Sequence, residues 1–377
     1  MFAFLKNSLS VSDIISIFAK KCMLNIEKLQ KFSAIKPSSS VLFDNYLYTQ
    51  LEEYEDMAND ILNDYPIDDK DSILKEISAA KIAIYDTVRL AFQGKHSYAF
   101  MKLLEYVQNH KPRICHEEPG NSFFRMRAFK DERKCDTNEL FHIPFDKQGQ
   151  VKTQRYSTPG LPCLYLGTSL LGCWEELGQP ALYSCVFSRL VNTDIVQLWD
   201  LRVPESVDGE DDLKRLLTTM PLIVACSIKV NNPNDNFKPE YIIPQYLLES
   251  LLISRELKNT INIIGIKYRS VIEDKIFRFP SSKYDNIAIP AIRGTNKYDD
   301  NLCKLFKITQ PTCEEYERIR YRKVIIDSGT AHEDFFTYKK SLFGEMESYI
   351  SNTDTFPLLE IENKPLNNGT ILSPYMK

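Results

Sequence analysis

Three side chains near the middle of the chain have the types and spacing of a site for an anionic ligand that carries a flat ring. Arg155 is followed by Tyr165 ten residues later, and Glu176 comes eleven residues after that. A guanidinium offers a planar fork of donors to a diphosphate or a ribose hydroxyl. A phenol ring can stack on a cationic heterocycle, and a carboxylate can stabilise a positive charge that develops during a reaction.

The residues around them predict a compact strand–turn–strand–helix unit. Residues 155–157 end a short extended run, and residues 158–160, Thr-Pro-Gly, have the composition of a turn. The apolar residues 161–167 predict a buried strand. Thr168 or Ser169 then caps a helix, which brings its carboxylates back toward the arginine.

Only one of two adjacent glutamates can face such a site. Neighbouring helix positions point about 100° apart, so Glu175 and Glu176 cannot both turn inward. Each residue also has a structural alternative: a surface carboxylate for Glu176, an ion pair with a glutamate for Arg155, and core packing for Tyr165.

The ordered set of motifs resembles the RES domain family, which is named for an arginine, a glutamate and a serine. The resemblance covers residues 121–282 and joins several pieces that are weak singly. Besides Arg155, Tyr165 and Glu176, the matching pieces in chain order are Phe124–Arg127, His142–Phe145, Ser157, Pro244-Gln245 and Gly265–Ser270.

The resemblance implies an NAD-consuming toxin with a fold like that of ADP-ribosyltransferases. NAD would be a substrate, and no separate cofactor is expected. The implied catalytic residues are Glu176, Arg155, Tyr165 and Ser270. The implied substrate-binding residues are Arg125, Arg127, Ser157, Tyr156 and Tyr268, with Arg125 or Arg127 holding phosphate.

The chemistry implied is cleavage of the bond between nicotinamide and ribose, through a transition state like that of glycoside cleavage. Water or phosphate would be the acceptor in a depletion enzyme, and a macromolecule would be the acceptor in a transferase. Members are often silenced by an antitoxin, and a long form with its own helical domain could belong to phage defence. The competing interpretation is a non-catalytic interaction protein built on a RES fold.

Other chemistries lack their motifs. The chain has neither G-x-G-x-x-G nor G-x-x-x-x-G-K-[ST], which argues against a hydride-transfer enzyme or an NTPase. The sequence around His142 suggests a catalytic histidine only superficially, because the five histidines have no partner spacing and no metal site is expected. No motif of a serine or cysteine nucleophile is present.

Arg89 and His96 resemble the ribonuclease motif of HEPN helical domains. That motif usually has a polar residue directly after the arginine, where this chain has Leu90. Gly94 and the basic residues beside it are more typical of the C-terminus of a helix. The nuclease interpretation is therefore the weaker one.

Composition sets the class of protein. A net charge of −4 and a pI near 5.9 argue against a nucleic-acid-coating surface, although a small basic pocket remains compatible. Nine cysteines without metal-ligand spacing predict reduced thiols in a cytoplasmic protein. We expect neither a secretory leader nor a membrane-spanning segment.

The predicted fold class is α+β, with a helical domain at residues 1–117, a RES domain at 118–330 and a C-terminal helix and tail at 331–377. The helical domain could serve as a regulator, an oligomerisation surface or a sensor. Its predicted helices cover residues 11–24, 42–62, 73–92 and 98–107. Later predicted helices cover 213–224, 241–257 and 335–350, and predicted strands cover 123–129, 181–187, 195–198, 261–268, 287–292, 303–308 and 322–326.

Overall fold

The computed structural model describes most of the chain in two interleaved compact units. The described residues are 27–33, 35–37, 41–64, 69–129, 135–207, 209–256, 262–271, 281–312 and 338–366. One unit joins Met1–Ile114 to Trp199–Ser250, and the other joins Cys115–Leu198 to Leu251–Lys377. The predicted domains followed chain order. In the structure, the segment Trp199–Ser250 belongs instead to the same unit as the N-terminal residues. The predicted helix at 11–24 and strand at 322–326 lie outside the described residues.

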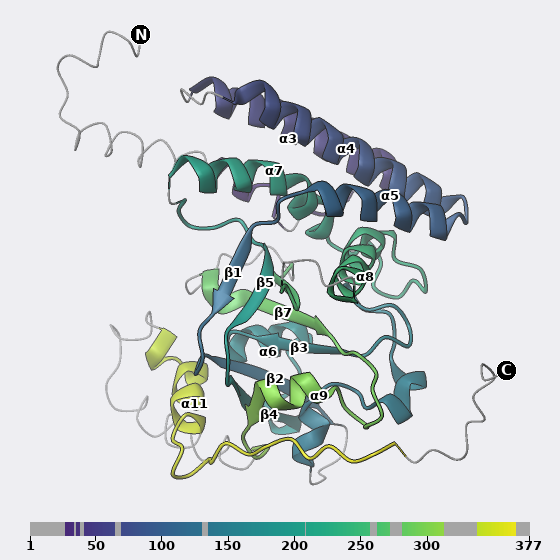
Figure 1. Cartoon of the computed structure of the whole chain (residues 1–377). Coiled ribbons are helices and arrows are strands. Elements are labelled where there is room, and N and C mark those ends of the chain that lie inside the picture. Colours follow the sequence, from purple (N-terminus) through teal and green to yellow (C-terminus); the bar gives the residue numbers. More distant parts are fainter. Residues whose placement is uncertain are drawn as a thin grey trace, which may run out of the picture. The chain divides into compact units, whose positions relative to one another are not determined.

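The first unit is built from amphipathic helices. Within it, α4 packs against α3, α5 and α7 (Figure 1). Leu47, Leu51 and Tyr54 of α3 form a buried i, i+3/i+4 stripe, whereas α7 is buried on all sides from Leu216 to Cys226. The predicted helices at 42–62, 73–92 and 98–107 are confirmed. The helices of this unit are α3 (Phe43–Asp64), α4 (Lys70–Phe92), α5 (His96–Asn109), α7 (Glu210–Cys226) and the part of α8 (Ile242–Glu256) up to Ser250, with a 3-10 turn η4 (Pro239–Tyr241).

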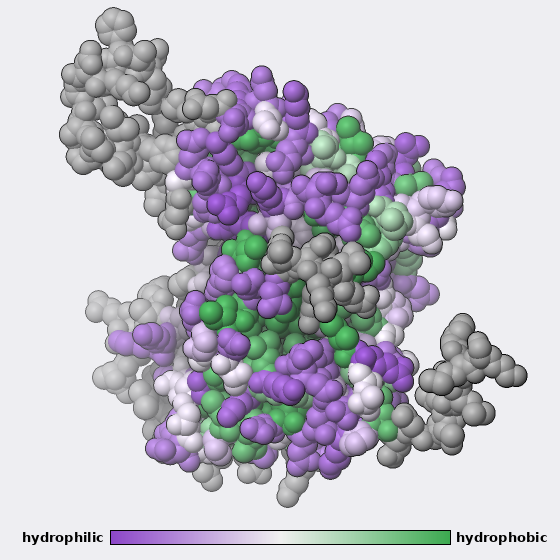
Figure 2. Space-filling model, viewed as in Figure 1, coloured by the Kyte–Doolittle hydropathy of each residue, from purple (hydrophilic) through white to green (hydrophobic). Residues whose placement is uncertain are grey.

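The junction of α4 and α5 is a helix end, as its sequence indicated. Gly94 follows the C-cap Gln93 with a φ of 74°, a left-handed conformation that glycine adopts without strain. Arg89 lies over the ring of Tyr85, and His96 Nδ1 lies 2.9 Å from the hydroxyl of Tyr246. The helices expose mainly hydrophilic side chains on the face seen in Figure 2.

The second unit is organised by an eight-stranded sheet in the order β1-β5-β6-β7-β3-β2-β4-β8. Its strands other than β6 and β8 are labelled in Figure 1. Its central pairs β2–β3, β2–β4, β3–β7 and β6–β7 are antiparallel. The strands are β1 (Ile114–Glu117), β2 (Ser122–Ala128), β3 (Cys163–Gly167), β4 (Cys185–Asn192), β5 (Val196–Leu201), β6 (Gly265–Arg269), β7 (Asp285–Pro290) and β8 (Phe306–Ile308).

The two faces of this sheet bury different apolar clusters because successive strand residues point to opposite sides. Phe123, Leu166 and Ile287 belong to one cluster. Phe124 belongs to the other, together with Leu170 of α6 (Leu170–Glu176). The face that carries α6 is therefore the face of Phe124, Gly167 and Asn286.

Several short elements complete the unit, and three differ from the prediction. The strand predicted at 181–187 begins with the 3-10 turn η3, so it is confirmed only from Cys185, where β4 starts. Cys303 lies in α9 (Asp300–Leu305), whose N-cap Asp299 accepts from two backbone amides, so the predicted strand 303–308 is confirmed only at β8. The last helix, α11, covers Leu342–Ile350 and is shorter than predicted. The 3-10 turns are η1 (Thr137–Leu140), η2 (Phe145–Gln150), η3 (Leu182–Ser184), η5 (Ser281–Tyr284) and η6 (Tyr338–Lys340).

Candidate functional site

Arg155 lies at the tip of a tight turn, which corrects the predicted extended run. The backbone amides of Gln154 and Ser157 each donate to the carbonyl of the other, at 2.9 and 3.2 Å, and this bridge holds Arg155 and Tyr156 between them. Arg155 is 8% exposed and Tyr156 is fully buried. The predicted turn after it is confirmed, because Gly160 has a φ of 87°.

Tyr165 projects from β3 toward this turn. Its hydroxyl lies 2.8 Å from Oγ of Ser157, which is itself buried. Burial raises the pKa of Tyr165 well above its usual value, so the phenol is held protonated. The turn and β3 are thereby joined by a buried hydroxyl pair.

Glu176 is the last residue of α6 and reaches back over the sheet. Ser169 caps this helix as predicted, its Oγ accepting from the Gly172 amide at 2.9 Å. Glu176 is exposed as a residue, yet its carboxylate is held on the protein side, where Asn286 Nδ2 donates to Oε1 at 2.7 Å. The Ser270 hydroxyl also donates to it, and the positive charge of Arg155 acts on it.

The environment of Glu176 has opposing effects on its acidity. Burial of the carboxyl group raises its pKa, and this effect dominates. The hydrogen bond from Ser270, the charge of Arg155 and the hydrogen bond from Asn286 each lower the pKa and offset part of the rise. A carboxylate with three stabilising partners and limited hydration interacts strongly with a nearby positive charge, because little water screens the interaction.

The strand register explains why distant residues meet here. Gly167 of β3 is aligned with Asn286 of β7, which is aligned with Tyr268 of β6. Aligned residues share a face, and a glycine at the centre leaves room for the helix that carries Glu176. Asn286 was not predicted from the sequence. Its only signal is a polar residue at the start of the apolar run of β7.

Ser270 and Tyr268 come from the end of β6. The Ser270 amide donates to the Tyr284 carbonyl at 2.8 Å, and Ser270 is 7% exposed. The ring of Tyr268 packs on Tyr156 with centroids 4.6 Å apart and planes tilted by 46°. Seven of the nine predicted residues, all except Arg125 and Arg127, thus lie around one point of the sheet.

Arg125 and Arg127 have a different orientation. Because successive residues of β2 point to opposite sides, Arg125 and Arg127 lie on the same face of the sheet as Phe123. Asn286 and α6 lie on the opposite face. Strands β2 and β3 are aligned at one pair of residues, Phe124 and Gly167. Arg125 Nη1 adds a further contact between the strands, donating to the carbonyl of Tyr165 at 2.9 Å. The structure therefore gives Arg125 a strand-bridging contact and does not bring it to Glu176.

A relative is found in Bacillus subtilis strain 168. The chain is 35% identical over 260 residues to a protein named "Putative toxin YopC" from that organism, an alignment that covers 60% of this chain and 55% of the relative. The chain spans about half the length of that relative. No family model matches the chain, and no solved structure matches it.

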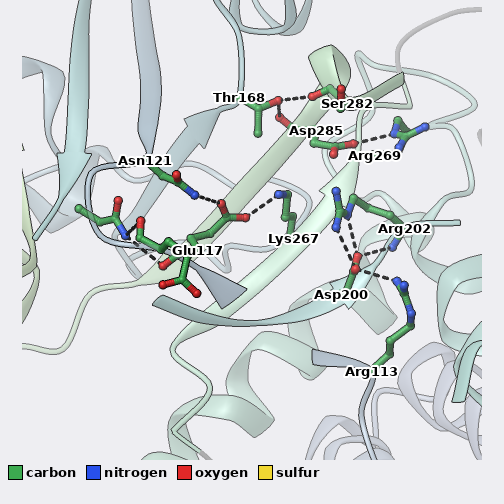
Figure 3. A network of polar contacts seen from close by, with 12 residues as sticks. Arg113, Glu117, Asn121, Thr168, Asp200, Arg202, Lys267, Arg269, Ser282 and Asp285 are labelled. Carbon is green, nitrogen blue, oxygen red and sulfur yellow. Dashed lines mark hydrogen bonds and ion pairs between the residues drawn. The ribbon is translucent and has the colours of Figure 1, made fainter. Parts of the chain in front are cut away.

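A polar network on the other face of the sheet fixes the strands that carry the site (Figure 3). The buried carboxylate of Glu117 accepts from Lys267 Nζ at 2.5 Å and from Asn121 Nδ2 at 2.9 Å. Arg269 Nε donates to Asp285 Oδ1 at 2.7 Å. Because Lys267 and Arg269 flank Tyr268, these pairs set the position of β6.

His142, in a segment that matches the family motifs, is built into the core. His142 is fully buried, its Nδ1 lies 2.8 Å from the Ile143 carbonyl, and its Nε2 accepts from the Asp299 amide at 3.0 Å. Burial lowers its pKa to about 4. His142 is thus a neutral core residue that ties two loops together.

In the helical unit, a carboxylate, an imidazole and a hydroxyl lie in the order of a catalytic triad, but the hydroxyl is not accessible to solvent. His110 Nδ1 lies 2.9 Å from Glu76 Oε1, and its Nε2 lies 3.4 Å from Thr219 Oγ1. Thr219 is fully buried, and the imidazole stacks between Tyr106 and Trp199. A hydroxyl without access to solvent cannot attack a substrate, so this cluster stabilises the helical unit.

Two further properties concern the described residues. None of their helices is both long enough and apolar enough to traverse a bilayer. Among the same residues, His, Cys, Asp and Glu side chains do not gather in threes as a metal centre requires. The seven cysteines found there are free thiols.

Proposed function

We propose that the chain breaks the nicotinamide–ribose bond of NAD, with Glu176 as the group that stabilises the reacting ribose. The observation that carries the proposal is the convergence of Arg155, Glu176, Ser270 and Asn286, from four separate segments, on one face of the sheet. A glutamate at an exposed helix end, whose carboxylate is held by donors on the protein side, is suited to face a cationic reaction centre.

The physical role of Glu176 follows from the chemistry of NAD. Nicotinamide leaves from the ribose C1′, and its departure leaves positive charge on the ribose ring. A preorganised carboxylate in a poorly hydrated site stabilises that charge more than water would. The donors Ser270 and Asn286 fix the carboxylate, so little reorganisation is needed when the charge develops.

The neighbouring residues would bind and orient the substrate. Arg155 at the tip of its turn is suited to a diphosphate or a ribose hydroxyl. Tyr165 presents an aromatic face for the nicotinamide ring, and its hydroxyl is already fixed by Ser157. Because Tyr156 and Tyr268 are packed on each other, we assign them to the wall of the site.

We further propose that this activity is toxic and that the chain belongs with the RES domain proteins. The name of the Bacillus subtilis relative supports a toxin. The spacing of Arg155, Tyr165 and Glu176, with Ser270 downstream, supports the RES assignment. Because RES toxins are often silenced by an antitoxin that blocks the cleft, we propose such a partner for this chain.

The test is release of nicotinamide from NAD by the purified chain. We expect Glu176→Gln to lower kcat by about 10²- to 10³-fold, because the uncharged amide cannot stabilise the ribose cation. Glu175→Gln is the matched control, since it changes the adjacent carboxylate on the same helix and should leave kcat unchanged. Wild-type activity in Glu176→Gln would remove this residue from the mechanism.

Mass analysis of the products distinguishes the acceptors. Free ADP-ribose indicates water, a phosphorylated ADP-ribose indicates phosphate, and a labelled macromolecule indicates a transferase. If the wild-type chain releases no nicotinamide and labels no acceptor, the non-catalytic interaction protein is the correct alternative.

A further inference from the structure

The helix that carries Glu176 depends on its neighbours for its orientation. With seven residues, α6 is far below the length at which an isolated helix is stable in water. Glu176 is its last residue, so any tilt of the first turn moves the carboxylate. The contacts made at the start of α6 therefore decide where Glu176 lies.

One of these contacts comes from the last helix of the unit. The Leu170 amide at the start of α6 donates to Oε1 of Glu347 in α11 at 2.7 Å. The Tyr338 hydroxyl donates to the same oxygen. Lys283 Nζ lies 3.7 Å from the other carboxylate oxygen and 4.3 Å from the centre of the Tyr338 ring. The Glu347 side chain is 13% exposed, which leaves little water to substitute for these partners.

A second group of contacts comes from η5. Thr168 Oγ1 donates to the Ser282 carbonyl at 2.6 Å, and the Thr168 amide donates to the Asp285 carbonyl at 3.0 Å. Ser169 Oγ donates to the Lys283 carbonyl. The segment that receives these bonds continues directly into Asn286, so the start of α6 and the donor to Glu176 are fixed together.

Apolar packing joins α11 to α6 as well. The ring of Phe343 lies 5.4 Å from that of Trp174, and both belong to the cluster that contains Leu170 and Leu171. A Cβ on Gly172 would lie 2.9 Å from the Lys283 carbonyl, so α6 sits in close contact with η5. The first turn of α6 is thus enclosed on two sides.

We propose that Glu347 is a positioning residue, which sets the orientation of α6 and thereby the placement of the Glu176 carboxylate. This inference rests on the proposed function of Glu176. Glu347 touches no reacting atom, because its carboxylate is occupied by Leu170, Tyr338 and Lys283 at the opposite end of the helix. Its segment also lies beyond residues 121–282, over which the family motifs extend.

The geometry of a short helix sets the size of the effect. Leu170 and Glu176 are separated by about 9 Å along the axis, from the rise of about 1.5 Å per residue. A tilt of about 10° would then displace the Glu176 end by about 1.5 Å, and displacements of about 1 Å can lower a rate by about 10²-fold. KM should change less than kcat, because Arg155, Tyr165 and Ser270 are not carried by α6.

The experiment compares two substitutions of one side chain. We expect Glu347→Ala to lower kcat for nicotinamide release by about 10- to 100-fold and to change KM by less than about threefold. Glu347→Gln keeps an oxygen that can accept from Leu170 and Tyr338, so it should restore kcat to within about threefold of wild type. Glu362→Ala changes an exposed glutamate of the same unit and serves as the surface control.

Amide hydrogen exchange gives a readout that does not depend on activity. Exchange in α6, including the Leu170 amide, should quicken in Glu347→Ala but not in Glu347→Gln. Tyr338→Phe should have an intermediate effect, because it removes one donor and keeps the ring. This second variant keeps the inference testable if Glu347→Ala does not fold.

The outcomes separate this inference from the proposed function. An unchanged kcat in Glu347→Ala, an equal loss in Glu347→Ala and Glu347→Gln, or an unchanged exchange rate in α6 would overturn the positioning role. If the wild-type chain releases no nicotinamide while α6 exchange still quickens in Glu347→Ala, the proposed function fails and the hold of Glu347 on α6 stands.

Discussion

At the scale of single residues, the candidate site depends on how the Glu176 carboxylate is stabilised. Burial favours its protonated form, and Ser270, Arg155 and Asn286 favour the ionised form that the proposed reaction needs. The activity should therefore have an acid limb, because kcat falls as Glu176 becomes protonated. That limb should lie at higher pH than for an ordinary glutamate, since the pKa is raised.

Asn286→Ala tests this balance. The hydrogen bond from Asn286 offsets part of the rise in the pKa of Glu176 that burial causes. Without this donor the pKa should rise further, and the acid limb of kcat should move to higher pH. The measurement is nicotinamide release over a range of pH. Asn234→Ala, in an exposed loop, should leave the profile unchanged. A profile for Asn286→Ala that coincides with that of wild type would contradict the assigned role of the amide.

The sequence predicted the parts of the site that are set by local spacing. Tyr165 and Glu176 were chosen by the spacing of the family motif, and the predicted strand, cap and helix between them are confirmed as β3, Ser169 and α6. Asn286 could not be chosen, because its contact with Glu176 depends on the register of β7 against β3. For Arg125, alternation along β2 was predicted, but which face would meet α6 is decided by tertiary packing.

At the scale of elements, β3 and α6 form the rigid part of the site because they approach closely at Gly167. A Cβ at this position would lie 2.6 Å from Cys173 Sγ and 3.2 Å from the Ser169 carbonyl. Both atoms belong to the cap and first turns of α6. Glycine is thus required by the close approach of the helix to the strand.

Gly167→Ala should therefore destabilise the fold and displace α6. We expect a loss of about 1–3 kcal/mol in the free energy of unfolding, the usual cost of overpacking a buried position. Gly149→Ala is the matched control, because a Cβ there meets no atom within 4 Å, and its effect should stay within about 0.5 kcal/mol. Urea denaturation measures both, and equal stability of the two variants would contradict the close approach.

Elements were predicted well where periodicity is long and poorly where it is short. The helices at 42–62 and 73–92 gave clear stripes and are confirmed as α3 and α4. The run from Cys303 to Ile308 is short and mixes four apolar residues with Lys304 and Lys307, a pattern that does not separate strand from helix. The Asp299 cap decides for helix in its first part. Likewise, the turn at Arg155 is closed by backbone bonds that no side-chain pattern indicates.

At the scale of the whole molecule, the order of the chain does not give the division into units. The segment Trp199–Ser250, which holds α7 and the first part of α8, lies between strands of the second unit in sequence but belongs with α3, α4 and α5. The sequence predicted an apolar helix at 213–224 and an amphipathic helix at 241–257, and neither pattern indicates which elements their apolar residues pack against. The buried cluster around His110 shows the partners of α7, since Glu76 of α4, Tyr106 of α5 and Thr219 of α7 surround its ring.

The stability of the fold should depend on pH through His142. Its pKa is about 4 in the folded chain against 6.5 when unperturbed, because burial disfavours the charged imidazolium. The charge of Arg125 lowers the pKa further, while the Ile143 carbonyl and the charge of Asp299 raise it and offset part of the effect. The unfolded chain then binds a proton below pH 6.5 that the folded chain does not bind until pH 4. This contribution is fully present above pH 6.5 and is lost as the pH falls toward 4, amounting to about 3 kcal/mol.

The decisive measurement is how steeply the free energy of unfolding changes with pH, and not its value at a single pH. His142→Gln should lower stability near neutrality, because it disturbs the bonds to Ile143 and Asp299, but it should flatten the fall between pH 6.5 and 4. His116→Gln changes an exposed histidine and should keep the wild-type slope. Chemical denaturation at several pH values gives both slopes. If His142→Gln loses stability on acidification as steeply as wild type does, protonation of this buried imidazole does not drive the loss.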